Sequence, residues 1–354
     1  MSKVIVGMSG GVDSAVTAYL LKEAGYEVIG VTLRTWLSDD GEEGRCCEID
    51  DARRVAWKLD IPYHTFNCTS VFDEKVIKPF VDSYICGLTP NPCIECNRYV
   101  KWERMMYAAK VLGADYIATG HYAYIERCDN GRYAVKKALH DKKDQTYMLY
   151  KLTQEQLSHT LMPLGKYSKD EVREIATKIG LSVASKPDSQ EICFVPDDDY
   201  AGFIEHNSSK PIPKEGNFVD EDGKVLGKHK GIIHYTVGQR KGLGLAMGTP
   251  VFVKEIRADR DEVVIGSEAS LYSDTVICDD VNFQSIDKPE IGERVRCRAK
   301  IRYHHKAADA YIEMIDEDRL KIIFDSPVKS ATPGQSAVFY DENDCVVGGG
   351  IIRK

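Results

Sequence analysis

Apolar residues in the first half of the chain fall into short runs separated by helical patterns. Valine and isoleucine dominate the runs, and the segments between them repeat apolar residues with helical spacing. The pattern predicts strands at residues 3–7, 27–33, 63–67 and 116–119, and helices at 13–25, 50–59, 73–86 and 97–112. Regular alternation of strand and helix is typical of an α/β fold with a parallel sheet, whose ligands bind at the carboxyl ends of the strands.

Turn and cap residues extend this prediction to about residue 213. Asn130-Gly131 predicts a hairpin turn between two strands, 122–127 and 132–137. The sequence from Ser168 to Glu171 is a capping box that opens a helix ending at Gly180. Residues 207–213, rich in Pro and Ser, indicate a linker.

After this linker the pattern changes to short strands with turn residues about every ten positions. The expected strands are 249–256, 262–265, 274–277, 294–303, 309–315, 320–324, 336–340 and 346–352. We predict three parts: an α/β domain with a parallel sheet at 1–206, a small central module at 207–272 and a C-terminal β-barrel at 273–354. The triple glycine 348–350 indicates a bulge or a close backbone contact.

The composition indicates the class of protein and its redox compartment. The chain has 354 residues, 43% hydrophobic and 29% charged, as expected of a globular protein with more than one domain. Eleven Cys, an odd number, without a secretory signal argue against a disulfide framework and for reduced thiols in the cytoplasm. We expect no membrane span.

The formal net charge of −8 hides a segregation of charge. Residues 223–253 carry five cations and no Asp or Glu: Lys224, Lys228, Lys230, Arg240 and Lys241. Further on, Arg294, Arg296, Arg298, Lys300 and Arg302 alternate with apolar residues, which predicts a strand with a row of cations on one face. A polyanion such as RNA fits this row better than a merely solvated face, because adjacent like charges repel one another.

The segment from Met8 to Ser14 has the character of a phosphate cradle. It lies where the first strand turns into a helix, and Gly10 and Gly11 let the backbone approach a ligand closely. Ser9 and Ser14 add hydroxyl donors, and the helix N-terminus favours negative charge. The segment is neither a Walker A loop nor a Rossmann fingerprint, and it resembles the SGGxDS loop of the ATP pyrophosphatases. The resemblance implies that residues 1–206 are an ATP-pyrophosphatase catalytic domain.

A second segment carries thiols. Cys93 and Cys96 follow Asn91-Pro92 at C-x-x-C spacing, and a helix predicted to start near Asn97 places its positive end beside Cys96. The spacing alone fits a redox dithiol or half a zinc site equally well.

Several motifs together resemble one family, the tRNA-specific 2-thiouridylases, over nearly the whole chain. They are the loop at 9–14, Asn91-Pro92 with Cys96-Asn97, Thr119 to Tyr122, Lys143-Asp144-Gln145, Ser189-Gln190 with Ile192-Cys193-Phe194, and Tyr235-Thr236 with Gly238 to Gly244. The resemblance implies ATP-dependent 2-thiolation of the wobble uridine of tRNA, with AMP transferred to the C2 carbonyl oxygen and then displaced by sulfur.

The same resemblance implies site residues. Asp13, Cys96 and Cys193 would be catalytic, with Cys193 as the persulfide carrier and Cys96 as the nucleophile that frees the sulfur or resolves the product through a Cys96–Cys193 disulfide. ATP with Mg²⁺ would be held by Gly7, Met8, Ser9, Gly10, Gly11, Val12, Asp13, Ser14, Leu33 and Gly120. The tRNA would contact His121, Lys143, Asp144, Gln145, Arg302, Tyr303 and Gln335.

The sequence leaves alternatives open for the sulfur chemistry and for the function. Some family members carry Asp where this chain has Cys93, so Cys93, Cys96 and Cys193 could instead hold a four-iron four-sulfur cluster. A sulfur-donor protein is an implied partner. The rival functions are an amide-forming synthetase, which would not need the thiols, and a non-catalytic RNA-binding protein, in which the phosphate loop would be idle.

Overall fold

The computed structural model describes residues 1–36, 48–140, 143–186, 192–195 and 199–353. Ser189 and Gln190 of the motifs above therefore lie outside the described residues. In the described part of the chain, no helix combines the length and the apolar character needed to cross a bilayer.

The N-terminal part is built on a five-stranded parallel sheet of order β3-β2-β1-β4-β7. Its strands are β1 (Lys3–Gly7), β2 (Glu27–Arg34), β3 (Tyr63–Asn67), β4 (Tyr116–Ala118) and β7 (Thr160–Leu161). A hairpin of β5 (Ala123–Arg127) and β6 (Tyr133–Lys137) follows β4. The predicted parallel sheet and hairpin are confirmed.

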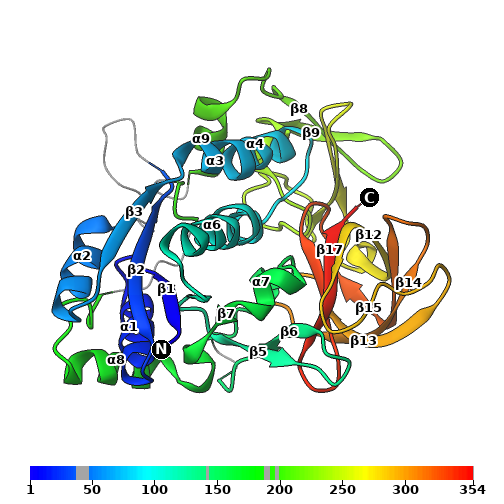
Figure 1. Cartoon of the computed structure of the whole chain (residues 1–354). Helices are drawn as coiled ribbons and strands as arrows, with labels where there is room; N and C mark the ends of the chain where they lie inside the picture. The colour runs from blue at the N-terminus through cyan, green and yellow to red at the C-terminus, as the bar shows by residue number, and fades with distance from the viewer. Residues whose placement is uncertain (37–47, 141–142, 187–191, 196–198, 354) are drawn as a thin grey trace.

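Helices cover both faces of this sheet, as Figure 1 shows. The α-helices in the described part of the chain are α1 (Val12–Glu23), α2 (Ile49–Lys58), α3 (Thr69–Phe72), α4 (Lys78–Ile85), α5 (Pro92–Glu95), α6 (Glu103–Leu112), α7 (Gln154–Ser158), α8 (Lys169–Lys178) and α9 (Tyr200–Asn207). Two π-helical turns, η1 (Asp73–Ile77) and η2 (Cys96–Trp102), join α3 to α4 and α5 to α6; the 3-10 turns are η4 (Thr146–Leu149), η5 (Pro163–Lys166), η7 (Ile232–His234) and η8 (Ala269–Leu271). Val4 and Val6 pack with α1, α2 and α8, whereas Ile5 packs with α6, so side chains that alternate along β1 serve two cores.

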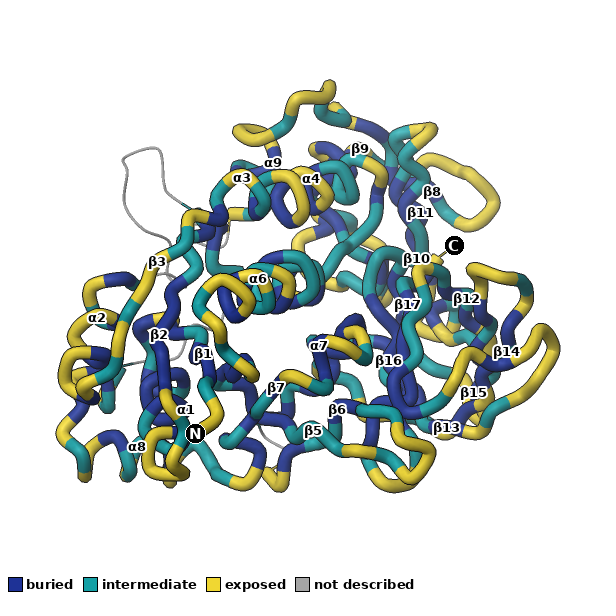
Figure 2. Tube along the Cα trace, in the orientation of Figure 1, coloured by how far each residue is buried: buried dark blue, intermediate teal, exposed yellow. Residues whose placement is uncertain are grey.

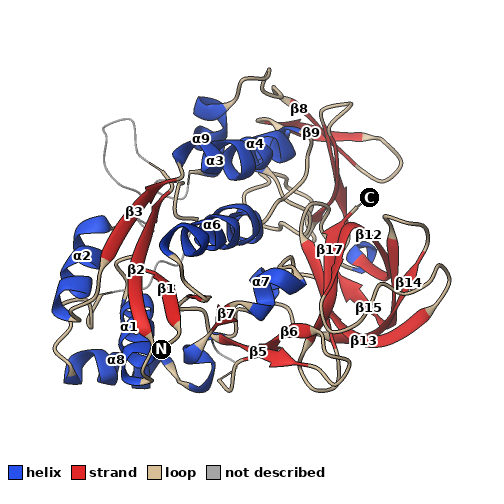
Figure 3. Ribbon diagram, in the orientation of Figure 1, coloured by secondary structure: helices blue, strands red, loops and turns tan. Residues whose placement is uncertain are grey.

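The remaining strands form two further sheets (Figure 3). The central sheet has the order β10-β11-β8-β9, with β8 (Gly216–Val219), β9 (Val225–His229), β10 (Phe252–Arg257) and β11 (Glu262–Gly266). The last six strands close into a barrel of order β12-β15-β14-β13-β16-β17. They are β12 (Tyr272–Phe283), β13 (Arg294–Lys300), β14 (Ala308–Met314), β15 (Leu320–Lys329), β16 (Ser336–Tyr340) and β17 (Val346–Ile352).

The barrel packs directly on the N-terminal part, and the interface strands β16 and β17 are buried there (Figure 2). A Cβ on Gly349 would lie 2.5 Å from a ring carbon of Tyr150, so the predicted close contact of the triple glycine is confirmed. The Tyr147 hydroxyl donates to Ser336 O at 2.7 Å, and Lys151 Nζ lies 2.5 Å from Glu95 Oε1 and 2.6 Å from Asp280 Oδ2.

Gln284 is the central polar anchor of this interface. It is 0% exposed, its Nε2 donates to Leu149 O at 2.9 Å and Tyr150 O at 3.1 Å, and its Oε1 accepts from Val135 N at 3.0 Å. The side-chain amide thus joins both β6, through Val135 N, and the segment around Leu149 and Tyr150 to the barrel.

Gln284→Leu should lower the free energy of unfolding by about 3 kcal/mol, because each buried backbone group left without a hydrogen bond costs about 1–3 kcal/mol. Urea unfolding followed by fluorescence measures this change. Asn343→Leu, at an exposed position, is the control and should stay within about 0.5 kcal/mol of wild type. Equal effects of the two changes would contradict the anchoring role of Gln284.

Candidate active site

The loop between β1 and α1 has the conformation of an anion cradle. Gly10 has φ +79°, which favours glycine, and a Cβ there would lie 2.7 Å from Glu48 O. Gly11 is extended and precedes the first helical residue, so the first amides of α1 open toward the loop. The nearest atom to a Cβ on Gly11 is Ser9 Oγ at 3.4 Å, so the space beside this residue is open.

Two serines hold the loop in shape. Ser14 Oγ accepts from Ser9 N at 3.2 Å and donates to Gly11 O at 3.1 Å. Ser14 is 5% exposed, and Val12 is buried in the core, so Val12 can offer a ligand only its backbone. The cradle is therefore preorganised before any phosphate arrives.

Gly120 lies against the first turn of α1. A Cβ at this position would lie 2.8 Å from Ser14 N and 2.9 Å from the Asp13 carbonyl carbon. Only glycine allows the loop after β4 to approach so closely.

Asp13 is fixed by two partners that the sequence did not reveal. The Tyr122 hydroxyl donates to Asp13 Oδ1 at 2.7 Å, and Lys169 Nζ donates to Oδ1 at 2.8 Å and to Oδ2 at 2.9 Å. The capping box at Ser168 predicted the start of α8. It did not indicate that Lys169, the first residue of α8, would contact the phosphate loop.

A pocket of about 210 Å³ opens beside this loop. Its lining includes these residues predicted from the sequence: Gly7, Met8, Ser9, Asp13, Ser14, Leu33, Cys96, Gly120, His121 and Gln145. Thr119, part of the motif from Thr119 to Tyr122, also lines it, as does Lys101, which the sequence analysis did not single out. The fold thus joins the phosphate cradle and one of the predicted reactive thiols in a single cavity.

His121 forms a neutral polar wall of the pocket. Its Nδ1 lies 2.8 Å from Thr119 Oγ1, and its ring centroid lies 5.4 Å from that of Trp102. Burial lowers the pKa of His121 well below its usual range. The imidazole is therefore uncharged at neutral pH, and one of its nitrogens can donate a hydrogen bond while the other accepts one.

Residues 143–145 lie next to the pocket, and Gln145 lines it. Gln145 Oε1 accepts from Tyr122 N at 3.0 Å, which links this segment to the loop after β4. The Asp144 carboxylate is 7% exposed and accepts from the Thr146 hydroxyl at 2.9 Å, and burial raises its pKa. The Tyr303 hydroxyl donates to Asp144 O at 3.2 Å, so the barrel reaches the pocket rim.

The helix that carries the C-x-x-C thiols starts earlier than predicted. Asn91 is its cap, with Oδ1 accepting from Cys93 N at 3.2 Å, and Pro92 is its first residue. Cys96 therefore lies one turn inside the helical run, and the expectation of a helix end beside Cys96 was wrong. The Asn-Pro pair was the available signal, because Asn caps helices and Pro is favoured in the first turn.

Cys193 lies in a short turn that large side chains anchor. Phe194 is 2% exposed and packs its ring 5.5 Å from Phe72 and 5.4 Å from Phe80, centroid to centroid. Cys96 and Cys193 pack against the same hydrophobic cluster, and both are thiols here. Within the described residues, no group of three or more His, Cys, Asp or Glu side chains is arranged to hold a metal ion.

The predicted basic strand has the expected alternation but not the expected open charge. Arg294 pairs with Glu313 at 2.7 Å, Arg296 with Asp325 at 2.6 Å, and Arg298 with Asp344 at 3.0 Å. Acidic residues on neighbouring barrel strands and turns balance these cations, which a single strand could not reveal. The expectation of open, unpaired cations is therefore wrong for these three.

The strand also ends earlier than predicted, at Lys300, so Arg302 and Tyr303 lie in the turn that follows. Arg302 Nη2 donates to Val237 O at 2.7 Å and contacts the Thr332 hydroxyl. Gln335 Nε2 donates to Thr89 O at 2.7 Å, close to the start of α5. Both side chains join different parts of the chain.

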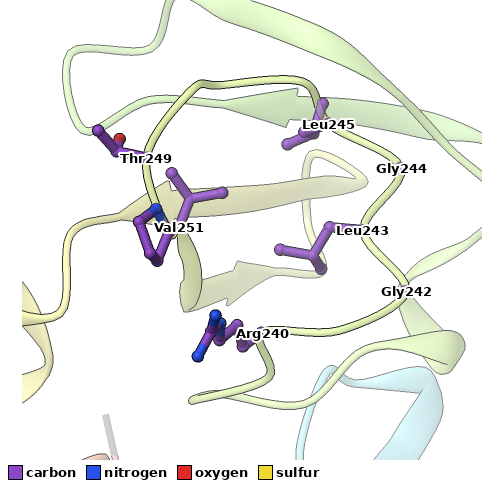
Figure 4. A pocket seen from close by; sticks show the side chains of 8 residues that line it. Arg240, Gly242, Leu243, Gly244, Leu245, Thr249 and Val251 are labelled. Carbon is purple, nitrogen blue, oxygen red and sulfur yellow. The ribbon is translucent and has the colours of Figure 1, made fainter.

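The five cations of residues 223–253, in the central module, are all exposed. In the described residues none of them is in an ion pair, in contrast to the barrel arginines. Arg240 stands beside a shallow recess of about 280 Å³ formed by the glycine-rich loop of residues 242–251 (Figure 4). This surface, rather than the barrel strand, carries the available positive charge.

Comparisons with known proteins agree with this arrangement. Three family models match: the tRNA methyl transferase HUP domain at residues 2–197, the tRNA methyl transferase PRC-barrel domain at 203–267 and the aminomethyltransferase β-barrel domain at 273–352. The tRNA-specific 2-thiouridylase MnmA of Lachnoclostridium phytofermentans is 57% identical over 100% of both chains. Its namesakes from Acetivibrio thermocellus and Clostridioides difficile are 56% and 54% identical, each over 99% of this chain and over 99% and 98% of their own. With a phosphate cradle and a thiol in one pocket, and relatives matched along their full length, the chain belongs to the tRNA-specific 2-thiouridylase family.

Proposed function

We propose that this protein thiolates C2 of the wobble uridine of tRNA in two chemical steps. ATP first transfers AMP to the C2 carbonyl oxygen with release of pyrophosphate, and sulfur then displaces AMP. As a family member the protein is an ATP-dependent tRNA sulfurtransferase. The observation that carries the two-step route is the single pocket lined by both Ser14 of the phosphate cradle and Cys96.

The first step needs an electrophilic phosphate held in place. The amides at the start of α1 and the hydroxyls of Ser9 and Ser14 suit the phosphates of ATP. Asp13 lies beside them, and Mg²⁺ bound to ATP would add positive charge. The C2 oxygen is a poor leaving group until AMP is attached, which is why the nucleotide and the base must share one pocket.

The second step needs a sulfur atom at the same place. We propose that Cys193 carries it as a persulfide received from a sulfur-donor protein. The Cys96 thiolate attacks Sγ of Cys193, a Cys96–Cys193 disulfide forms, and the terminal sulfur leaves as hydrosulfide. Hydrosulfide adds to C2, AMP leaves, and a reductant of the thiol class must reduce the disulfide before the next turnover.

The cluster alternative needs Cys93, Cys96 and Cys193 to converge. The described residues contain no such metal-binding group, so the donor geometry does not fit a cluster and favours the persulfide.

The tRNA would place its anticodon loop at the pocket and its helical part on the central module. The unpaired bases of a loop can be splayed into a pocket at modest cost. His121, Lys143, Asp144, Gln145, Tyr303, Arg302 and Gln335 are proposed contacts near the base. The exposed cations from Lys224 to Lys241 would track phosphates.

Ser14→Ala and Asp13→Ala should abolish AMP transfer while tRNA affinity stays within about threefold of wild type. Both residues shape the phosphate cradle, which lies apart from the basic surface. Pyrophosphate release and tRNA filter binding measure the two properties. Ser158→Ala, at a half-buried position of α7 outside the pocket lining, is the control, and a parallel loss of both properties would contradict the proposed separation.

Cys193→Ser should abolish formation of 2-thiouridine but leave ATP and tRNA binding nearly intact, because the change removes a sulfur carrier and little volume. Mass spectrometry of digested tRNA measures the product. Cys86→Ser, at an exposed thiol, should remain active.

Cys93→Ser separates the two sulfur routes within the same assay. A mild loss of activity, with no iron or acid-labile sulfide in anaerobically purified wild-type protein, agrees with the persulfide. A severe loss together with bound iron would overturn it.

Lys228→Gln should weaken tRNA binding and lower the slope of log K against log salt by up to about 1. Arg296→Gln is the matched control, because Asp325 already balances its charge, and its slope should equal that of wild type. If instead Arg296→Gln lowered the slope and Lys228→Gln did not, the docking surface would be the barrel.

A further inference from the structure

Thr119 and His121 form a buried hydrogen-bonded pair on one wall of the active-site pocket. Both residues line the pocket, and they are 5% and 9% exposed. Thr119 directly follows β4, and Gly120 between the two lies tightly against α1, so the loop that carries the pair has a fixed course. The distance of 2.8 Å between Thr119 Oγ1 and His121 Nδ1 is that of a good hydrogen bond.

The Thr119 hydroxyl decides which ring nitrogen of His121 carries the proton. Among the described residues, His121 Nδ1 is the one acceptor within hydrogen-bond distance of this hydroxyl. A buried hydroxyl hydrogen without an acceptor is costly, so Thr119 donates and Nδ1 accepts. The imidazole is neutral because burial lowers its pKa. Its single nitrogen-bound proton therefore lies on Nε2.

The surroundings of the ring leave this Nε2–H to a ligand. In the described part of the chain Nε2 has no hydrogen-bond partner, and it is not one of the polar atoms sealed in the interior without one. It therefore reaches the open space of the pocket that His121 lines. Trp102 packs its ring 5.4 Å from the imidazole, centroid to centroid. Trp102 is itself fixed, since it is 0% exposed and its Nε1 donates to Thr160 Oγ1 at 2.9 Å.

Gln145 adds a second donor to the same wall. Its Oε1 accepts from Tyr122 N at 3.0 Å, and Tyr122 is the next residue after His121. With the amide oxygen bound to the backbone, the Nε2 amide group is the part of Gln145 that remains for a ligand in the pocket. In both side chains a hydrogen bond within the protein occupies an acceptor atom and leaves a donor.

We propose that Thr119, by fixing His121 as a hydrogen-bond donor, makes this wall of the pocket select uracil over cytosine at the wobble position, an inference that rests on the proposed function. The two bases differ at position 4, where uracil has a carbonyl oxygen that accepts hydrogen bonds and cytosine has an amino group that donates them. A fixed donor therefore binds uracil and is left unpaired against cytosine.

The depth of the two side chains assigns His121 to this position. In a pyrimidine, C4 lies opposite N1, the atom bonded to ribose, so position 4 is the part of the base that enters a pocket furthest. His121 is buried, whereas Gln145 is half-buried, so the imidazole faces O4. Thr119 acts through His121 and is a positioning residue.

The position of the proton is measured in protein without ATP or tRNA. A long-range proton–nitrogen NMR spectrum of isotope-labelled histidines distinguishes the two tautomers, and the His121 signals are identified by their loss in His121→Gln. Wild-type protein should carry the proton on Nε2. Thr119→Val removes the hydroxyl and should give a mixture of both tautomers, and Thr119→Ser should restore the wild-type state. A proton on Nδ1 in wild-type protein would overturn the proposal.

The base preference is measured by the binding of anticodon stem-loops that carry uridine or cytidine at the wobble position. Wild-type protein should bind the uridine form about tenfold more tightly, because a buried donor left unpaired is costly. In Thr119→Val this ratio should fall about fivefold, because His121 can then present either nitrogen, and in Thr119→Ser it should stay within about twofold of wild type. Thr177→Val, at an exposed position of α8, is the matched control and should keep the wild-type ratio.

An unchanged ratio in Thr119→Val would also overturn the proposal. Equal losses of affinity for both stem-loops in Thr119→Val and Thr119→Ser, with lowered melting temperatures, would show a purely structural role and contradict it as well. Neither measurement uses ATP or a sulfur donor. Protein that shows the expected proton position and base preference but forms no 2-thiouridine would therefore contradict the proposed function alone.

Discussion

The approach of the loop after β4 to the first turn of α1 sets the geometry of the whole site. Gly120 lies so close to Ser14 N that any side chain would collide with the backbone. This contact brings His121 and Tyr122 to the phosphate loop, and Tyr122 then fixes Asp13. The phosphate loop and the pocket wall that carries His121 therefore meet at one backbone contact, so a movement of one must also move the other.

The barrel and the central module pack against segments of the N-terminal part that lie next to the pocket. Gln284 and Lys151 bind the barrel to the segment after η4. The segment before α5 contacts both other parts, since Thr89 N donates to Pro333 O at 2.9 Å and the Thr89 hydroxyl to that of Thr236 at 3.4 Å. The helix that carries Cys96 thus begins at a junction of all three parts.

The barrel, the central module and the pocket differ in how far their charged side chains are paired. On the barrel, acids from neighbouring strands and turns balance the arginines, so this face carries little unpaired positive charge. In the central module, the five cations of residues 223–253 are exposed, and none of them is in an ion pair among the described residues. Inside the pocket, His121 is neutral because burial lowers its pKa.

Local sequence determined the elements and their order: the parallel sheet, the phosphate loop between β1 and α1, the hairpin, the central module and the barrel. It also determined Cys96 and Cys193 as thiols of interest, because motifs and periodicity are properties of neighbouring residues. Partners distant in the chain were decided by tertiary structure alone. Lys169 meets Asp13 and Asp325 meets Arg296 only after the chain folds. Lys101 was hidden for a different reason: a helical periodicity of 3.6 residues directs positions five apart away from each other, and Lys101 and Cys96 line one pocket because both lie in the wider π-helical turn η2.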